Sequence, residues 1–239
     1  MAQTAKTLWV VHYNTAQEFL TKAIEVGATS VAIRTDNNLS LAIPLFHGQN
    51  IKVFGWRWPS AKRDAAMKEA GKVADLLANG LDGYYVDPEG DPGQPWDWNQ
   101  KGLDGLAEDF CQTIKTAAPD KPLGVTSHYR ANKVFPNLPW GKFFQHADVF
   151  LPQAYWRSTQ GVIGHGIPPD NYSMALDFWQ RAGADVAKIV PMAGEIGVAT
   201  ATEVGAYASA AAAHQISSLH YYAFTEDVNT SVWNAIART

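Results

Sequence analysis

The sequence has 239 residues, of which 46% are hydrophobic and 18% are charged, with a formal net charge of −4. This balance, without a basic run, argues against nucleic acid or another polyanion as partner. No stretch approaches the ~18 apolar residues of a membrane span, and the N-terminus has no apolar signal core. We therefore expect a soluble chain with no signal peptide and no membrane partner, which could still act outside the cell after leader removal or phage-type release.

Apolar strand-like segments alternate with helical patterns along the whole chain. In chain order, strands are expected at 7–13, 30–34, 51–56, 83–87, 123–128, 149–155, 188–193 and 219–224, with helices at 15–26, 62–79, 101–118, 172–182, 202–215 and 229–239. Such alternation indicates a parallel sheet in an α/β protein. Eight units in a chain of this length predict one (β/α)8 TIM-barrel domain over 1–239.

Metal, cofactor and disulfide chemistry lack their usual patterns. Cys111 is the single cysteine, and it falls in an amphipathic helix, so we expect a small core residue. His12 and His128 have no partner at metal-ligand spacing. The sequence therefore predicts no metal and no cofactor, and it leaves the oligomeric state open.

The segment 81–91 runs from an apolar strand directly into acidic residues. Because side chains alternate along a strand, Tyr85, Asp87 and Glu89 share one face. Two carboxyl groups this close affect each other's protonation, as an acid catalyst requires. The alternative is a loop with solvated acids, which Pro88 and Gly90 would suit.

In a barrel of this kind, catalytic and binding groups come from the carboxyl ends of the strands. Aromatic residues gather at these predicted ends and in the fourth loop, where their ring faces can stack on sugars. The alternative is that they close the top of the barrel. Those assigned to substrate binding are Tyr13, Trp56, Trp58, Trp96, Tyr129 and Trp156.

Short motifs resemble a known group of enzymes. The segment Asp82-Gly83-Tyr84-Tyr85-Val86-Asp87-Pro88-Glu89 is similar to the Asp-x-x-Asp-x-Asp-x-Glu signature of family 18 chitinases and endoglycosidases, and Gln153-Ala154-Tyr155 to their Gln-x-Tyr element. The Asp-x-Glu pair more distantly resembles family 25 lysozymes. Two departures stand out: Tyr85 replaces the second signature Asp, and the first strand ends in His12-Tyr13-Asn14 where those lysozymes have an Asp.

The resemblance implies a TIM-barrel glycosidase that cleaves an N-acetylhexosamine polysaccharide, peptidoglycan or chitin. Glu89 would be the general acid. Asp87 would raise the proton affinity of Glu89 or hold a substrate acetamido group that acts as internal nucleophile. Tyr155 would hydrogen-bond that group, or else be a core tyrosine. Tyr222, near the end of the eighth predicted strand, would supply the aromatic floor, and Gln153 would contact substrate.

Glu195, after the seventh predicted strand, is the rival second carboxylate. If it faces Glu89, a mechanism with two carboxylates follows, in which their separation decides retention or inversion. The alternative is an ion pair with Arg157 or another arginine of the rim.

Two other function classes stay open. One is a catalytically silent carbohydrate-binding barrel, because a fold does not guarantee chemistry. The other is a barrel enzyme of different chemistry that grips an anionic substrate with Arg34, Arg57 and Arg130.

Overall fold

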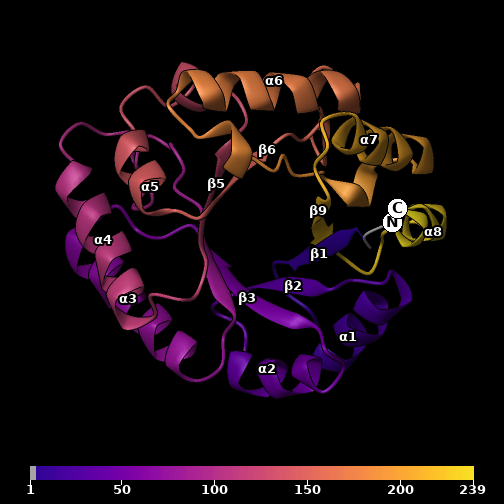
Figure 1. Ribbon diagram of the computed structural model, residues 1–239, viewed down its shortest axis with the longest axis horizontal. Helices are drawn as coiled ribbons and strands as arrows, with labels where there is room; N and C mark the ends of the chain where they lie inside the picture. Colours follow the sequence, from indigo (N-terminus) through magenta and orange to yellow (C-terminus); the bar gives the residue numbers. More distant parts are fainter. Residues whose placement is uncertain (1–3) are drawn as a thin grey trace.

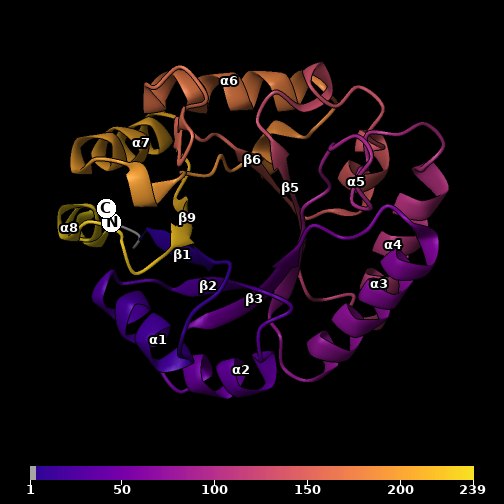
Figure 2. The same cartoon turned by 180° about the vertical axis from the view of Figure 1, so that it is seen from behind.

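The computed structural model describes residues 4–239. Residues 1–3, part of the predicted domain 1–239, lie outside the described residues. The strands form the centre and the helices form a ring around them (Figure 1), an arrangement that is equally clear from behind (Figure 2). This is the α/β architecture that the alternation of strands and helices predicts.

Seven strands form one parallel sheet, in the order β6-β5-β4-β3-β2-β1-β9. Their bounds are β1 Ala5–Val10, β2 Ser30–Arg34, β3 Lys52–Arg57, β4 Gly83–Val86, β5 Leu123–His128, β6 Val149–Gln153 and β9 Ser218–Phe224. The predictions for these strands differ from the structure by three residues at most. A short antiparallel hairpin, β7 Arg157–Ser158 with β8 Gly161–Val162, lies outside this sheet.

The predicted strand 188–193 is not a regular strand. The segment begins at a 3-10 turn, Val186–Lys188, and Pro191 within it has no N–H to donate to a strand ladder. The N–H of Val190 donates to the carbonyl of Phe150 on β6 at 2.7 Å, and that of Ala193 donates to His220 on β9 at 2.9 Å. The segment therefore lies between the two edge strands and bonds to both, while the regular sheet has seven strands rather than the predicted eight.

Eight α-helices surround the sheet in the described part of the chain: α1 Ala16–Glu25, α2 Leu39–His47, α3 Arg63–Ala78, α4 Asp104–Ala117, α5 Trp140–His146, α6 Pro168–Arg181, α7 Ala201–Ala213 and α8 Thr230–Arg238. The sequence did not predict α2 and α5. Cys111 is buried on α4, which confirms its assignment to the core. No helix among residues 4–239 is long and apolar enough to cross a membrane.

Large side chains fill the inside of the curled sheet. Trp9 stacks on Tyr85 with ring centroids 5.1 Å apart, and Phe54 stacks on the other side of Tyr85 at 4.9 Å. Trp56 and Leu151 complete this buried inner cluster from β3 and β6. Because the interior is packed, a substrate can reach the sheet only at its rim.

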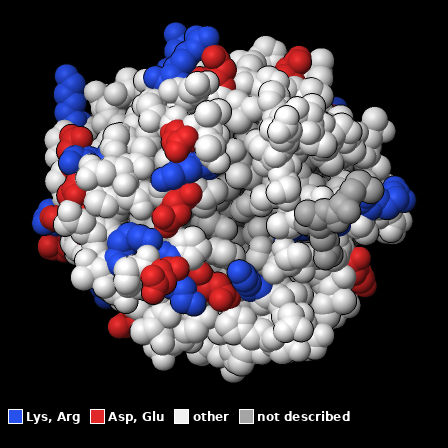
Figure 3. All heavy atoms as spheres, viewed as in Figure 1, with Lys and Arg blue, Asp and Glu red and all other residues white. Residues whose placement is uncertain are grey.

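The face shown in Figure 3 carries basic and acidic side chains interleaved, mainly over its left half. Neighbouring charges of opposite sign also form ion pairs on the surface, as between Lys115 and Asp148 at 3.1 Å. This face therefore presents no extended surface of one charge.

Candidate active site

The acidic segment after β4 is fixed at the inner rim of the sheet. Tyr85 belongs to the inner cluster, so alternation along the chain brings Asp87 and Glu89 to the same face at the carboxyl end of the strand. Asp87 is 6% exposed, and Glu89 is half-buried. The backbone is held on both sides, because the Ser127 hydroxyl donates to the carbonyl of Pro88 at 2.7 Å and the N–H of Trp98 donates to that of Glu89 at 2.7 Å.

A side-chain amide from β6 joins the two acids. The Nε2 of Gln153 donates to Oδ1 of Asp87 at 2.9 Å and to Oε1 of Glu89 at 3.1 Å. The two acids therefore lie close enough to share one donor, and each carboxyl group affects the pKa of the other. Two carboxyl groups this close titrate as a pair rather than independently.

Burial raises the pKa of both acids. The charge of Glu89 and its hydrogen bond raise the pKa of Asp87 further, well above the usual range, and the Gln153 amide opposes this. For Glu89, the hydrogen bonds from Asp87 and Gln153 oppose the effect of burial. Both carboxyl groups therefore hold a proton to higher pH than a solvated acid does.

Tyr155 and Tyr222 form an aromatic wall beside the acids. Their rings stack with centroids 5.3 Å apart. Burial raises the pKa of Tyr155 well above its usual value, and the neighbouring Tyr222, Asp87, Glu89 and Glu195 raise it further. Tyr155 is thus a neutral phenol close to all three carboxyl groups, and it can act as a hydrogen-bond donor.

Two positions that the sequence analysis did not single out hold Tyr155 in place. Asn171 on α6 is fully buried; its Nδ2 donates to the carbonyl of Tyr155 at 2.6 Å, while its Oδ1 accepts from the N–H of His165 at 2.7 Å. Gly194 lies against the Tyr155 ring, so that a Cβ at this position would overlap it. Neither residue belongs to a motif, and a lone Asn or Gly in a sequence does not reveal such contacts.

Glu195 lies at the same rim but outside the bonded pair. Its Oε2 accepts from the N–H of Thr159 at 3.2 Å, whereas Arg157 pairs with Glu203 at 2.7 Å. The alternative of an ion pair between Glu195 and Arg157 is therefore wrong. Glu195 and Tyr222 line an open cavity of about 420 Å³ at this rim, and neither Asp87 nor Glu89 is among its lining residues.

The predicted aromatic residues divide into two groups. Trp58 and Trp96 are half-buried in rim loops, where part of each side chain is accessible. The other four pack against neighbouring side chains, so they do not enter the proposed site. Trp56 is in the inner core with its Nε1 donating to Val10 at 2.9 Å. Trp156 is fully buried against Tyr207, 5.9 Å away.

The remaining two aromatic residues pack behind the strands. Tyr13 stacks on Phe19 of α1 at 5.9 Å, and Tyr129 is 2% exposed in a small cluster with Ala175 of α6. A position at the end of a strand does not by itself show whether a side chain faces the substrate site or packs under a helix. Within residues 4–239, no group of three or more His, Cys, Asp and Glu side chains is arranged to hold a metal ion.

The chain matches no model of a known protein family and no curated protein sequence. Solved structures with this fold include the chitinase domain of the spore coat protein CotE from Clostridium difficile, 15% identical with a TM-score of 0.52 over 80% of this chain and 64% of that one. The GH18 chitinase ChiB from Flavobacterium johnsoniae is 11% identical, with a TM-score of 0.67 over 99% of this chain and 93% of that one.

A third solved structure, the glycoside hydrolase domain of PgaB (BpsB) from Bordetella bronchiseptica, is 9% identical, with a TM-score of 0.66 over 98% of each chain. The structural neighbours are thus GH18 chitinases and other TIM-barrel glycoside hydrolases. At these identities the likeness shows the fold alone, and the chemistry must be argued from the site.

Proposed function

We propose that this protein is a glycoside hydrolase that cleaves an N-acetylhexosamine-containing polysaccharide, of the peptidoglycan or chitin type, with Glu89 as general acid. The observation that carries the proposal is the Asp87–Glu89 pair at the rim, in which one Gln153 amide donates to both carboxyl groups. A barrel that only binds sugar has no need to bury two acids side by side, because burial of carboxyl groups costs free energy. We also infer that segment 189–193 closes the sheet as its eighth member.

Protonation of the glycosidic oxygen requires a proton on Glu89. Burial raises the pKa of both acids, so the pair retains a proton to higher pH than solvated carboxyl groups do. A substrate acetamido N–H that donates to Asp87 would favour the ionised form of Asp87 and transfer the proton to Glu89. Binding of an N-acetylated sugar would in this way protonate Glu89 and prepare it to act as the general acid.

The same acetamido group then supplies the nucleophile. With Asp87 as acceptor for its N–H and the phenol of Tyr155 as donor for its oxygen, the group is oriented to attack the anomeric carbon as the glycosidic bond breaks. Gln153 keeps the two carboxyl groups aligned, and Tyr222 with Trp58 offers aromatic surface for sugar rings. In this scheme Glu195 contributes to binding in the cavity that it lines with Tyr222.

The alternative of an enzyme that grips an anion with three arginines finds less support. Arg130 donates to the hydroxyl of Tyr129 at 2.9 Å, behind the strands. Arg34 and Arg57 are instead joined through Asp36. The three do not form a common anion site.

The test uses N-acetylglucosamine oligomers and purified peptidoglycan, with release of new reducing ends as the readout. We expect cleavage of at least one of these substrates, inhibition by a thiazoline mimic of the cyclised intermediate, and no cleavage of an oligomer that lacks acetamido groups. Sugar binding without any cleavage would instead identify a silent carbohydrate-binding barrel.

A further inference from the structure

Arg34 is a feature of the mouth that the proposed chemistry does not use. It ends β2, and Ala32 on the same strand faces the inner cluster, so alternation brings Arg34 to the inner face at the rim. The residue is only 9% exposed. Because β3 alone separates β2 from β4, Arg34 and Asp87 emerge from strands about 10 Å apart, within reach of neighbouring sugar units.

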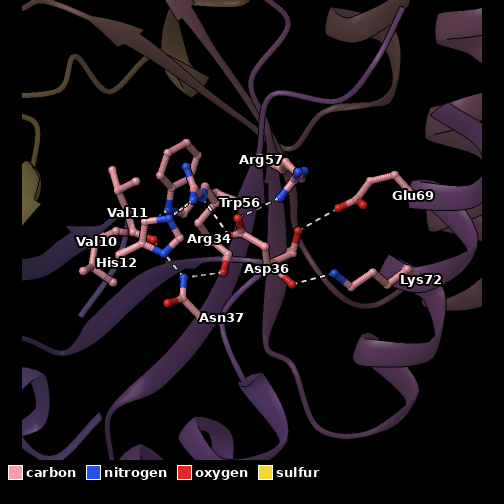
Figure 4. A network of polar contacts seen from close by, with 11 residues as sticks. Val10, Val11, His12, Arg34, Asp36, Asn37, Trp56, Arg57, Glu69 and Lys72 are labelled. Atoms are coloured by element: carbon pink, nitrogen blue, oxygen red, sulfur yellow. Dashed lines mark hydrogen bonds and ion pairs between the residues drawn. The ribbon is translucent and has the colours of Figure 1, made fainter. Parts of the chain in front are cut away.

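Three contacts fix the Arg34 guanidinium. Its Nε donates to Oδ1 of Asp36 at 2.7 Å, and its Nη2 contacts Nε2 of His12. Its Cζ lies over the Trp58 ring, 4.9 Å from the centroid. Figure 4 shows His12, Arg34, Asp36 and Arg57 converging in one network. An arginine fixed in this way loses little conformational entropy when it binds a ligand.

This network carries an excess of positive charge. Asp36 pairs with Arg34 through one oxygen and with Arg57 through the other, at 3.4 Å. Among residues 4–239, no other acid lies within ion-pair distance of either arginine. Burial of Asp36 acts to raise its pKa, but the two arginines outweigh this and hold that pKa below the usual value. One ionised carboxylate therefore balances two guanidinium groups.

The positive network lies at the same rim of the sheet as the acid pair, and a chain of aromatic contacts leads from it to Tyr222. Trp58 packs on Trp56 at 5.3 Å, and Trp56 packs on Tyr222 at 5.9 Å. Burial is the main cause that raises the pKa of Tyr222; the charge of Asp87 raises it further, whereas that of Arg34 opposes the shift. Tyr222 therefore lies near enough to feel the charges of both Asp87 and Arg34.

The geometry points to Arg34, beside Trp58, as the binding residue for a carboxylate on a sugar unit adjacent to the one held at Glu89. The substrate would then be an acidic glycan, with the carboxylate supplied by the lactyl group of a muramate unit or by a uronate. This inference rests on the proposed hydrolase function. With a net charge of −4 the protein does not attract anions at long range, so the selectivity must be local.

The test measures binding by calorimetry with Glu89→Gln protein, which separates binding from cleavage. The ligands are a neutral N-acetylglucosamine tetrasaccharide, a muramate-containing tetrasaccharide as free acid or carboxamide, and a glucuronate-containing tetrasaccharide. We expect at least one free acid to bind about tenfold or more tightly than the neutral sugar, as a charge-assisted hydrogen bond provides. The acid that binds identifies the source of the carboxylate.

Arg34→Gln should abolish this preference and leave neutral binding unchanged, whereas the matched change Arg130→Gln should alter neither. If the Arg34→Gln protein does not fold, the inference is tested on protein that keeps Arg34. The measurement is then the affinity for the free acid against the affinity for the carboxamide. Equal affinity for the two forms overturns the inference, as does a preference that survives Arg34→Gln. Acid-selective binding without any cleavage would overturn only the hydrolase proposal; cleavage without acid selectivity would overturn only the inference.

Discussion

Asp87 and Glu89, two positions apart on one chain, accept hydrogen bonds from the same amide nitrogen, Nε2 of Gln153, at the rim of the sheet. Their hydrogen-bond donor Gln153 comes from β6, two strands away in the sheet. The pair therefore depends on the tertiary structure for its geometry, although its position follows from the alternation of one strand. It also makes the protein's stability sensitive to pH.

The first prediction concerns that sensitivity. A carboxyl group whose pKa is raised in the folded state stabilises the fold below its usual pKa, near 4, and this contribution is lost as pH rises through the folded pKa. Asp87→Asn removes the titrating group. Between pH 4 and pH 7, the free energy of unfolding of the wild type should therefore fall by about 1 kcal/mol or more relative to the variant.

Urea unfolding at the two pH values measures this difference. The matched control is Asp109→Asn, because Asp109 is a surface residue paired with Arg63 and its replacement should leave the pH dependence close to that of the wild type. A parallel pH dependence in wild type and Asp87→Asn would contradict the raised pKa.

The second prediction separates the two carboxylate mechanisms. If the acetamido group is the nucleophile, Glu195→Gln should keep hydrolysis of N-acetylated polymer within about tenfold of wild type, because Glu195 then only contacts substrate. Initial rates of hydrolysis by the folded Glu195→Gln variant distinguish the two mechanisms. A loss as large as that caused by Glu89→Gln would make Glu195 the second catalytic carboxylate.

A third prediction tests the packing behind Tyr155. Gly194→Ala places a methyl group where the Tyr155 ring lies, so the ring must move away from the acids, and turnover should fall by about 100-fold. At Gly197, three residues on, a Cβ would be 3.6 Å from the nearest atom. Gly197→Ala is the matched control and should keep its activity; equal rates in the two variants would show that Tyr155 does not need its position.

The fourth prediction concerns Asn171. Asn171→Ala leaves the buried carbonyl of Tyr155 and the N–H of His165 without this partner, at about 1–3 kcal/mol for each unsatisfied group. Thermal or urea unfolding should show that loss, together with a lower turnover. Ser173→Ala, an exposed change on the same helix, should change neither stability nor rate. A fully stable Asn171→Ala protein would contradict the structural role of the amide.

Sequence patterns predict the regular elements here because their apolar periodicity is strong. The strands 30–34 and 123–128 agree with β2 and β5 at both ends. Where another constraint competes, prediction fails: α2 contains Pro44 and is apolar on most sides, and α5 has only seven residues. Segment 189–193 is extended, but its pairing consists of isolated bonds that no residue pattern shows.

The residues of the candidate site likewise divide into those that the sequence predicts and those that it does not. Asp87 and Glu89 could be found because neighbours on one strand face share an environment, whatever the rest of the fold does. The sequence could not show which aromatic residues face the site, because side chains of adjacent residues point in different directions. Tyr155 lies beside the acids, whereas its neighbour Trp156 packs in the outer core. Contacts across the chain, such as those of Asn171 and Arg34, become visible only in three dimensions.

The most direct measurement is the rate of hydrolysis of N-acetylated glycan by Glu89→Gln, next to Asp91→Asn as matched control on the exposed side of the same loop. With Glu89 as general acid, its amide keeps the shape but has no proton to transfer, so the rate should fall by about 10²- to 10⁴-fold while oligosaccharide binding persists. Asp91→Asn should retain activity close to that of the wild type. Unchanged turnover in Glu89→Gln would contradict the proposed chemistry at this pair.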